Sequence, residues 1–305
     1  MQSFYFVLQI FIVLGLGFFS APYLSASIRQ LIFKILAYFS YLLLISVAFE
    51  LTQALHQISN PTSMLPPALL IAFTTSLGSF FICLFIFKCI DRQHIQGKIS
   101  FQLFINALKN IAKAFLAVAV GIILGLIVQT TQVSIEFNSW YLLLLFIFLI
   151  GVELAFTTFN RSWLSWKILL VPIAAFIGSA LASIVNYALL AQHYAFNEVF
   201  ALAQGYGWYS MSGILFTELH SAKLGGIALL TDLFREIFAI LLMYCLGWRF
   251  PRSAISSAGA TSMDATLVMV KQSCGTHYIP YAMMSGLILT LLAPLLISLG
   301  LHFKF

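Results

Sequence analysis

Charged side chains are scarce in this sequence. Only 8% of its 305 residues are Asp, Glu, Lys or Arg, whereas 62% are hydrophobic. Soluble domains average about 25% charged residues, so a water-soluble domain is not expected. The composition predicts an all-α polytopic membrane protein, because helices satisfy their own backbone hydrogen bonds inside a bilayer. We expect one transmembrane transporter domain over residues 1–305.

Several motifs are also missing, and each absence narrows the function. No GxxxxGK[ST] sequence occurs, so a P-loop for ATP-driven transport is not expected. The four cysteines show no CxxC spacing and the six histidines are dispersed, so neither a metal site nor a cofactor is predicted. The net charge of +6 comes from basic residues scattered at span ends, which does not indicate a nucleic-acid partner.

Long apolar runs predict about eight transmembrane helices. Two further stretches, 198–219 and 253–272, are long enough to cross but are rich in Gly, Ser, Thr and acids. They predict two re-entrant or broken helical segments. The alternative is ten transmembrane helices. The eight apolar runs lie near 4–24, 31–51, 66–88, 109–129, 139–156, 167–191, 224–247 and 278–301.

The basic residues alternate between the connections of these spans. The second, fourth and sixth connections contain no Lys or Arg, whereas the first, third and fifth contain several. The positive-inside rule then places the N- and C-termini in the periplasm, with Arg249 and Arg252 in the cytoplasm. Residues 46–51 and 151–154 share a short sequence similarity. The two spans that contain them are predicted to run in opposite directions, as an inverted repeat would produce.

The span expected at 224–247 carries three charges: Asp232, Arg235 and Glu236. A charged side chain at the bilayer centre costs roughly 2.5–3.5 kcal/mol, so these side chains are expected to face a polar cavity or one another. Asp232 and Glu236 share a helix face, and Arg235 can pair with Asp232 at i, i+3. One carboxylate is then left to take up a proton or a substrate cation. The alternative is a wholly structural triad.

Two segments of small residues predict a binding site. Residues 204–218 contain three glycines among serines and aromatics, and residues 258–266 combine small residues, hydroxyls and one acid. Non-helical backbone at membrane depth needs protein or water around it, so we expect the two segments to meet within the membrane. The alternatives are a tight crossing of small residues and an interfacial loop. The candidate binding residues are Tyr209, Ser210, Ser212, Gly213, Glu218, Thr261, Ser262 and Asp264.

Three motifs in these regions resemble the LysO-type L-lysine exporters. They are GYGWYSMSGILFTE at 205–218, TDLFRE at 231–236 and GATSMDAT at 259–266. Their order and spacing match as well, and the similarity extends from about residue 200 to the end. The earlier half matches in length and hydropathy, with GVEL at 151–154 as a local match.

The resemblance implies a secondary transporter of the bacterial inner membrane that exports L-lysine and its toxic analogue thialysine by proton antiport. It also implies a pair of water-exposed acids within the membrane. One matches Glu236, and Glu50 is the candidate for the other in the second span. The implied partners are L-lysine, protons and the lipid bilayer, with a homo-oligomer left open.

The chemistry of lysine suits these residues. A carboxylate can pair with the side-chain ammonium, while half-helix N-termini and hydroxyls can hold the α-carboxylate. Several alternatives stay open: a cation/proton antiporter that binds Na⁺ directly, an exporter of another basic amino acid, and a passive channel. An enzyme is not expected. An intramembrane protease would need Asp232 and Asp264, but the sequence before Asp264 lacks the GxGD-type motif of such proteases.

Overall fold

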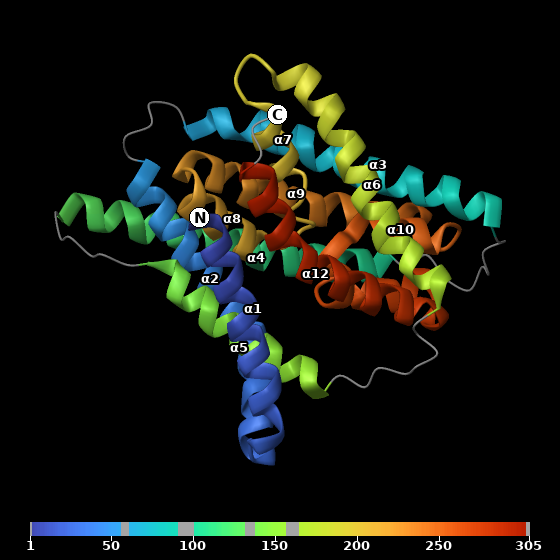
Figure 1. Cartoon of the computed structure of the whole chain (residues 1–305), viewed down its shortest axis with the longest axis horizontal. Helices are drawn as coiled ribbons and strands as arrows, with labels where there is room; N and C mark the ends of the chain where they lie inside the picture. Colours follow the sequence, from blue (N-terminus) through green and yellow to red (C-terminus); the bar gives the residue numbers. More distant parts are fainter. Residues whose placement is uncertain (1, 56–60, 91–100, 132–137, 157–164, 303–305) are drawn as a thin grey trace. The chain divides into compact units, whose positions relative to one another are not determined.

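The computed structural model describes residues 2–55, 61–90, 101–131, 138–156 and 165–302 (Figure 1). Within these ranges every regular element is helical, which confirms the all-α prediction. Six helices are long and apolar enough to cross a membrane, or seven if the bent helix α2 counts as a span. The chain is therefore a polytopic membrane protein, and the predicted number of eight crossings stays a prediction.

Each of the eight predicted spans coincides with a helix. Helix α9 is as long as α6 but carries three charged residues in its apolar middle. The eight helices are α1 (Gln2–Ser20), α2 (Ala26–Leu55), α3 (Leu65–Ile90), α4 (Phe101–Thr131), α5 (Ser139–Phe156), α6 (Trp166–Leu190), α9 (Ala222–Leu246) and α12 (Ile279–His302).

The two stretches of mixed composition form interrupted helices. The first consists of α7 (Phe196–Leu202) and α8 (Tyr209–Leu219), joined by irregular backbone. The second consists of α10 (Pro251–Ala258), η4 (Gly259–Met263), α11 (Leu267–Met269) and η5 (Val270–Cys274). Neither stretch is one continuous helix, so the predicted breaks are confirmed, while the re-entry of these segments into the membrane stays a prediction.

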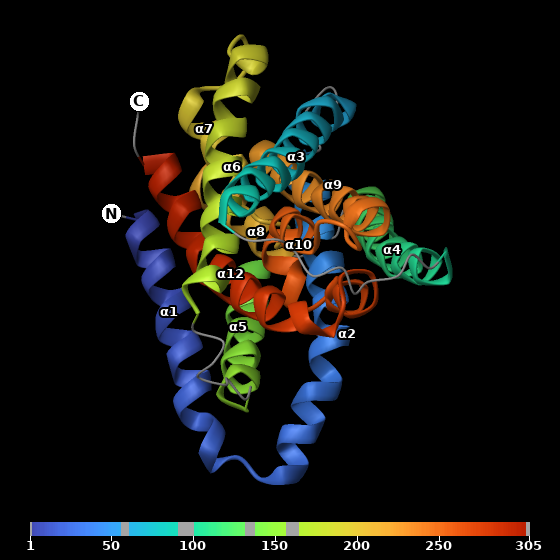
Figure 2. The same ribbon diagram turned by 90° about the vertical axis from the view of Figure 1, so that its right-hand side faces the viewer.

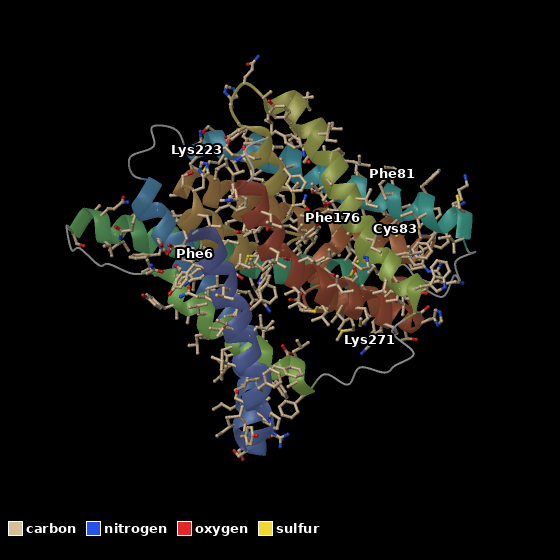
Figure 3. The ribbon with its side chains drawn as sticks, viewed as in Figure 1. Phe6, Phe81, Cys83, Phe176, Lys223 and Lys271 are labelled. Carbon is tan, nitrogen blue, oxygen red and sulfur yellow. The ribbon has the colours of Figure 1, made fainter. Side chains whose placement is uncertain are left out.

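The chain divides into two compact units. The first comprises Met1–Pro61, Lys113–Phe159 and Gly213–Gly226. In it, α1 packs against α5 (Figure 2). At this contact Gly17 faces Gly151, and a side chain at either glycine would overlap the other helix. Small residues allow this close approach of two apolar helices. Phe6 of α1, labelled in Figure 3, packs edge-on against Trp140, with ring centroids 4.6 Å apart.

The second unit comprises Thr62–Ala112, Asn160–Ser212 and Ile227–Phe305. Here α3 crosses α6 with Gly78 against Gly178, again too close for a side chain. Helix α10 packs on both α3 and α6, and α12 packs on α6, α7 and η4. Most outward-facing side chains of α3 are apolar, such as Phe81, which is 57% exposed and suited to contact lipid (Figure 3).

Arg252 is not the exposed loop charge that the topology argument assumed. It lies on α10, is only 4% exposed, and places its guanidinium over the rings of Phe87 and Tyr281 at 4.4 and 5.2 Å. Such cation–π contacts stabilise a buried cation. The assignment of the connection after α9 to the cytoplasm therefore depends on Arg249, which is exposed. The periplasmic termini stay a prediction, and Met1 and residues 303–305 lie outside the described residues.

Candidate functional site

The two interrupted segments contact each other inside the second unit. The backbone N–H of Ala260 donates to the carbonyl of Tyr206 at 2.8 Å. Gly207 has φ +86° and a side chain there would press on Thr261, while Gly259 has φ +65° and lies against the Tyr206 carbonyl. Both conformations favour glycine. The expected meeting of the segments is confirmed, and their depth in the membrane stays a prediction.

Asp232 fixes the break between α7 and α8. The backbone N–H of Gly207 donates to its Oδ1 at 2.8 Å, and the hydroxyl of Ser212 donates to its Oδ2 at 2.5 Å. Asp232 is 1% exposed, and a side chain on Gly205 would overlap its carboxylate. Both carboxylate oxygens therefore accept hydrogen bonds from the irregular backbone and the start of α8.

Arg235 points toward the crossing of α3 and α6 and is also only 1% exposed. Its Nη1 donates to the carbonyl of Ala203 at 3.3 Å. Its Nη2 donates to the hydroxyls of Ser79 and Ser179 at 3.4 and 3.2 Å. The guanidinium carbon lies 5.1 Å from the ring centre of Tyr206. Arg235 thus connects α9 to α3, α6 and the first break.

The predicted ion pair between Asp232 and Arg235 does not form in the part of the chain that the structure describes. The reason is local competition for Asp232. The first break places an N–H and a hydroxyl at hydrogen-bonding distance from its carboxylate, so Asp232 is held by Gly207 and Ser212. Helical spacing alone could not reveal this, because it ignores donors from the rest of the chain.

Glu236 is buried in a different way. It is 4% exposed and makes no hydrogen bond to any described residue. The charge of Asp264, an exposed residue at the end of η4, lies near enough to act on it. A buried carboxylate without a partner is costly, so this position favours a proton or a cationic group as its partner.

Other predicted binding residues use their polar groups to hold the breaks. The hydroxyl of Thr261 donates to Ala258 at 2.9 Å. The hydroxyl of Ser262 lies 2.8 and 2.9 Å from the carbonyls of Gly259 and Ala282. Tyr209 and Ser210 begin α8, where Ser210 is buried and Tyr209 is partly exposed. A role of these residues in binding stays a prediction.

Glu50, Gly213 and Glu218 belong to the first unit. The backbone N–H of Ser139, the first residue of α5, donates to Glu50 Oε2 at 3.0 Å. A carboxylate at a helix N-terminus is a stabilising arrangement. The charge of Glu50 acts on Glu218, which Asn138 also contacts. The structure thus groups Glu50 with Glu218, and separately groups Glu236 with Asp264.

Sequence reasoning missed the two serines that accept from Arg235. Both follow a glycine in an apolar span, as Gly78-Ser79 and Gly178-Ser179. This repeated dipeptide was the available signal, since a glycine marks a close helix crossing and the adjacent hydroxyl marks a buried polar contact. No group of three or more metal-ligating side chains occurs among the described residues.

Comparison with known proteins identifies the family of the chain. A sequence model described as "Lysine exporter LysO" matches residues 115–301, which include the whole of α9 and both breaks. The lysine exporter LysO of Escherichia coli (strain K12) is 36% identical over 162 residues, which are 52% of this chain and 54% of that protein. By this match the chain spans about half the length of that relative.

A protein named as a proposed lysine exporter in Haemophilus influenzae (strain ATCC 51907 / DSM 11121 / KW20 / Rd) is 28% identical over 183 residues. That match covers 59% of this chain and 93% of the relative. No solved structure matches the chain. Because the family model matches more than half of the 305 residues, the chain belongs to the LysO family of lysine exporters.

Proposed function

We propose that this protein exports L-lysine, and thialysine with it, across the bacterial inner membrane in exchange for protons. Membership of the LysO family supports lysine as the substrate class. The observation that carries the mechanism is Glu236, a 4% exposed carboxylate without a hydrogen-bond partner among the described residues. No enzymatic reaction is proposed, because transport requires only binding and release.

Exchange follows from competition for one carboxylate. When protonated, Glu236 is neutral and suits its buried position. When ionised, it needs a cation, and the ammonium of the lysine side chain is such a group. The charge of Asp264 nearby favours a cation at the same place. Since a proton and an ammonium cannot both occupy Glu236, loading one releases the other.

Asp232 supplies the frame for this exchange. Its two hydrogen bonds hold the break beside α8, and the break holds η4 through the bond from Ala260 to Tyr206. A rigid frame keeps Asp264 and Glu236 at a fixed separation, which matters for a site that must bind and release one cation. Glu50 is proposed as the second acid of the pathway, in the first unit.

The direct test is exchange of radiolabelled L-lysine by the purified full chain in proteoliposomes with an imposed pH gradient. Lysine should accumulate against its own gradient when the proton gradient is applied, and thialysine should compete. Movement of Na⁺ that ignores lysine would favour the cation antiporter instead. Lysine flux that only follows its own gradient would indicate a passive channel.

The membrane orientation needs its own test. We propose that reporters fused after Gln192 read periplasmic and reporters fused after Arg249 read cytoplasmic, because exposed basic residues favour the inside. A periplasmic signal after Arg249 would overturn the proposed orientation of the last helices.

A further inference from the structure

The buried groups around Arg235 have an excess of hydrogen-bond donors. A guanidinium has five N–H donors and no acceptor. Those of Arg235 reach neutral oxygens at 3.2–3.4 Å, and its Nε has no partner among the described residues. Ser179 accepts from Arg235, and no described group accepts the hydrogen of its own hydroxyl. Gln204, beside Ala203, has a fully buried amide nitrogen without a described partner.

No described carboxylate accepts a hydrogen bond from this cluster, although the charge of Asp232 acts on Arg235. Asp232 lies three residues before Arg235 on α9, but its oxygens accept from Gly207 and Ser212 instead. The hydrogen bonds of Arg235 therefore go only to neutral acceptors, and its guanidinium also faces the ring of Tyr206. A buried cation without a paired anion is costly. The group that best matches the planar fork of a guanidinium is a carboxylate, which can accept two parallel hydrogen bonds.

We propose that Arg235, with the hydroxyl of Ser179 and the amide of Gln204, binds the α-carboxylate of the transported amino acid. This inference rests on the proposed function, in which Glu236 binds the side-chain ammonium. Arg235 and Glu236 are consecutive on α9 and leave the helix in different directions, so the proposal requires an extended basic amino acid that spans from one side chain to the other. The site then recognises a free α-carboxylate as well as a cation.

The low exposure of Arg235 sets how the carboxylate binds. At 1% exposure the guanidinium has no room for an additional ligand without some rearrangement. Its bonds to Ser79 and Ser179 are long, at 3.4 and 3.2 Å, so they are the contacts that a charged acceptor would replace. A substrate without a carboxylate leaves these bonds in place and gains nothing from Arg235.

The proposal predicts discrimination between lysine and its analogues that lack a carboxylate. The experiment measures how unlabelled L-lysine, L-lysinamide and cadaverine compete with labelled lysine exchange by the full chain in proteoliposomes. In the wild type, lysinamide and cadaverine should compete at least about tenfold more weakly than lysine, as expected for one lost hydrogen bond to a charged group.

Two variants then test which residues distinguish lysine from lysinamide. Ser179→Ala removes the free hydroxyl donor, and Arg235→Lys keeps the charge but removes the fork. Each should weaken competition by lysine about tenfold and leave lysinamide unchanged, so the ratio between them falls. The matched control is Ser183→Ala, because Ser183 is a buried serine of the same helix that donates to Ala180 within that helix. Its ratio should equal that of the wild type.

The outcomes separate this inference from the function on which it rests. An equal loss for lysine and lysinamide would mean that these residues only support the fold. If lysine exchange is normal and the ratio is unchanged in both Ser179→Ala and Arg235→Lys, the carboxylate site is refuted while lysine export stands. Absence of lysine exchange in the folded wild type would refute the proposed export and the carboxylate site together.

Discussion

Asp232 and Glu236 lie one turn apart on α9 and are almost equally buried, at 1% and 4% exposure, yet their surroundings differ. Asp232 accepts two hydrogen bonds from the first break. Glu236 accepts none from the described residues. Burial alone therefore does not identify a transport residue. What separates the two acids is whether the fold supplies donors to the carboxylate or leaves it for a mobile partner.

The largest effect on folding is expected from Asp232→Ala. The substitution leaves the N–H of Gly207 and the hydroxyl of Ser212 without their acceptor. A buried group left without its hydrogen bond costs about 1–3 kcal/mol, so the two together should lower the free energy of unfolding by about 3 kcal/mol or more. Folded yield in detergent and the thermal midpoint measure this loss.

The neighbour Thr231→Val provides the control for Asp232→Ala. Thr231 is 1% exposed and its hydroxyl has no hydrogen-bond partner among the described residues. Loss of that hydroxyl should leave stability unchanged or raise it. A similar loss in both variants would mean that Asp232 does not hold the break through these two bonds.

A smaller loss of stability is expected from Gly259→Ala, which disturbs the contact between the two interrupted segments from the second of them. Gly259 has φ +65°, and a methyl group there would overlap the carbonyl of Tyr206. A non-glycine residue in such a conformation costs about 1–3 kcal/mol. The thermal midpoint should fall accordingly. Gly15→Ala is the control, since a side chain at Gly15 meets nothing within 4 Å.

Asp264→Asn should have the smallest effect and should change transport rather than folding. Asp264 is exposed, and an exposed charge contributes up to about 1 kcal/mol to an ionic interaction. The lysine concentration for half-maximal exchange should therefore rise about two- to fivefold with an unchanged thermal midpoint. An unchanged lysine response would remove Asp264 from the ammonium site and leave Glu236 to bind it alone.

The sequence predicted the helical fold well because apolar runs and breaks are local signals. All eight apolar runs are helices, and glycines and hydroxyls at 204–218 and 259–266 indicated both interruptions. The hydrogen-bond partners of individual side chains could not be predicted in the same way, because they come from distant parts of the chain. The spacing of Asp232 and Arg235 favoured an ion pair, but the first break supplied other donors to Asp232.

The partners of Arg235 could not be predicted for the same reason. Its acceptors Ser79 and Ser179 lie 156 and 56 residues away along the chain, on helices whose crossing is defined only in three dimensions. The burial of Arg252 was missed because a basic residue at a span end is normally exposed, whereas here aromatic rings from α3 and α12 enclose it.

The central claim is that Glu236 exchanges a proton for the lysine ammonium, and one variant tests it most directly. Glu236→Gln retains size and cannot be ionised. Since removing a buried charge does not strand a partner here, its thermal midpoint should match or exceed that of the wild type. In proteoliposomes with a pH gradient, its proton-coupled lysine flux per folded molecule should fall at least about a hundredfold, the factor for roughly 3 kcal/mol. Lysine flux at the wild-type rate with the same dependence on pH would contradict the claim and assign Glu236 a structural role.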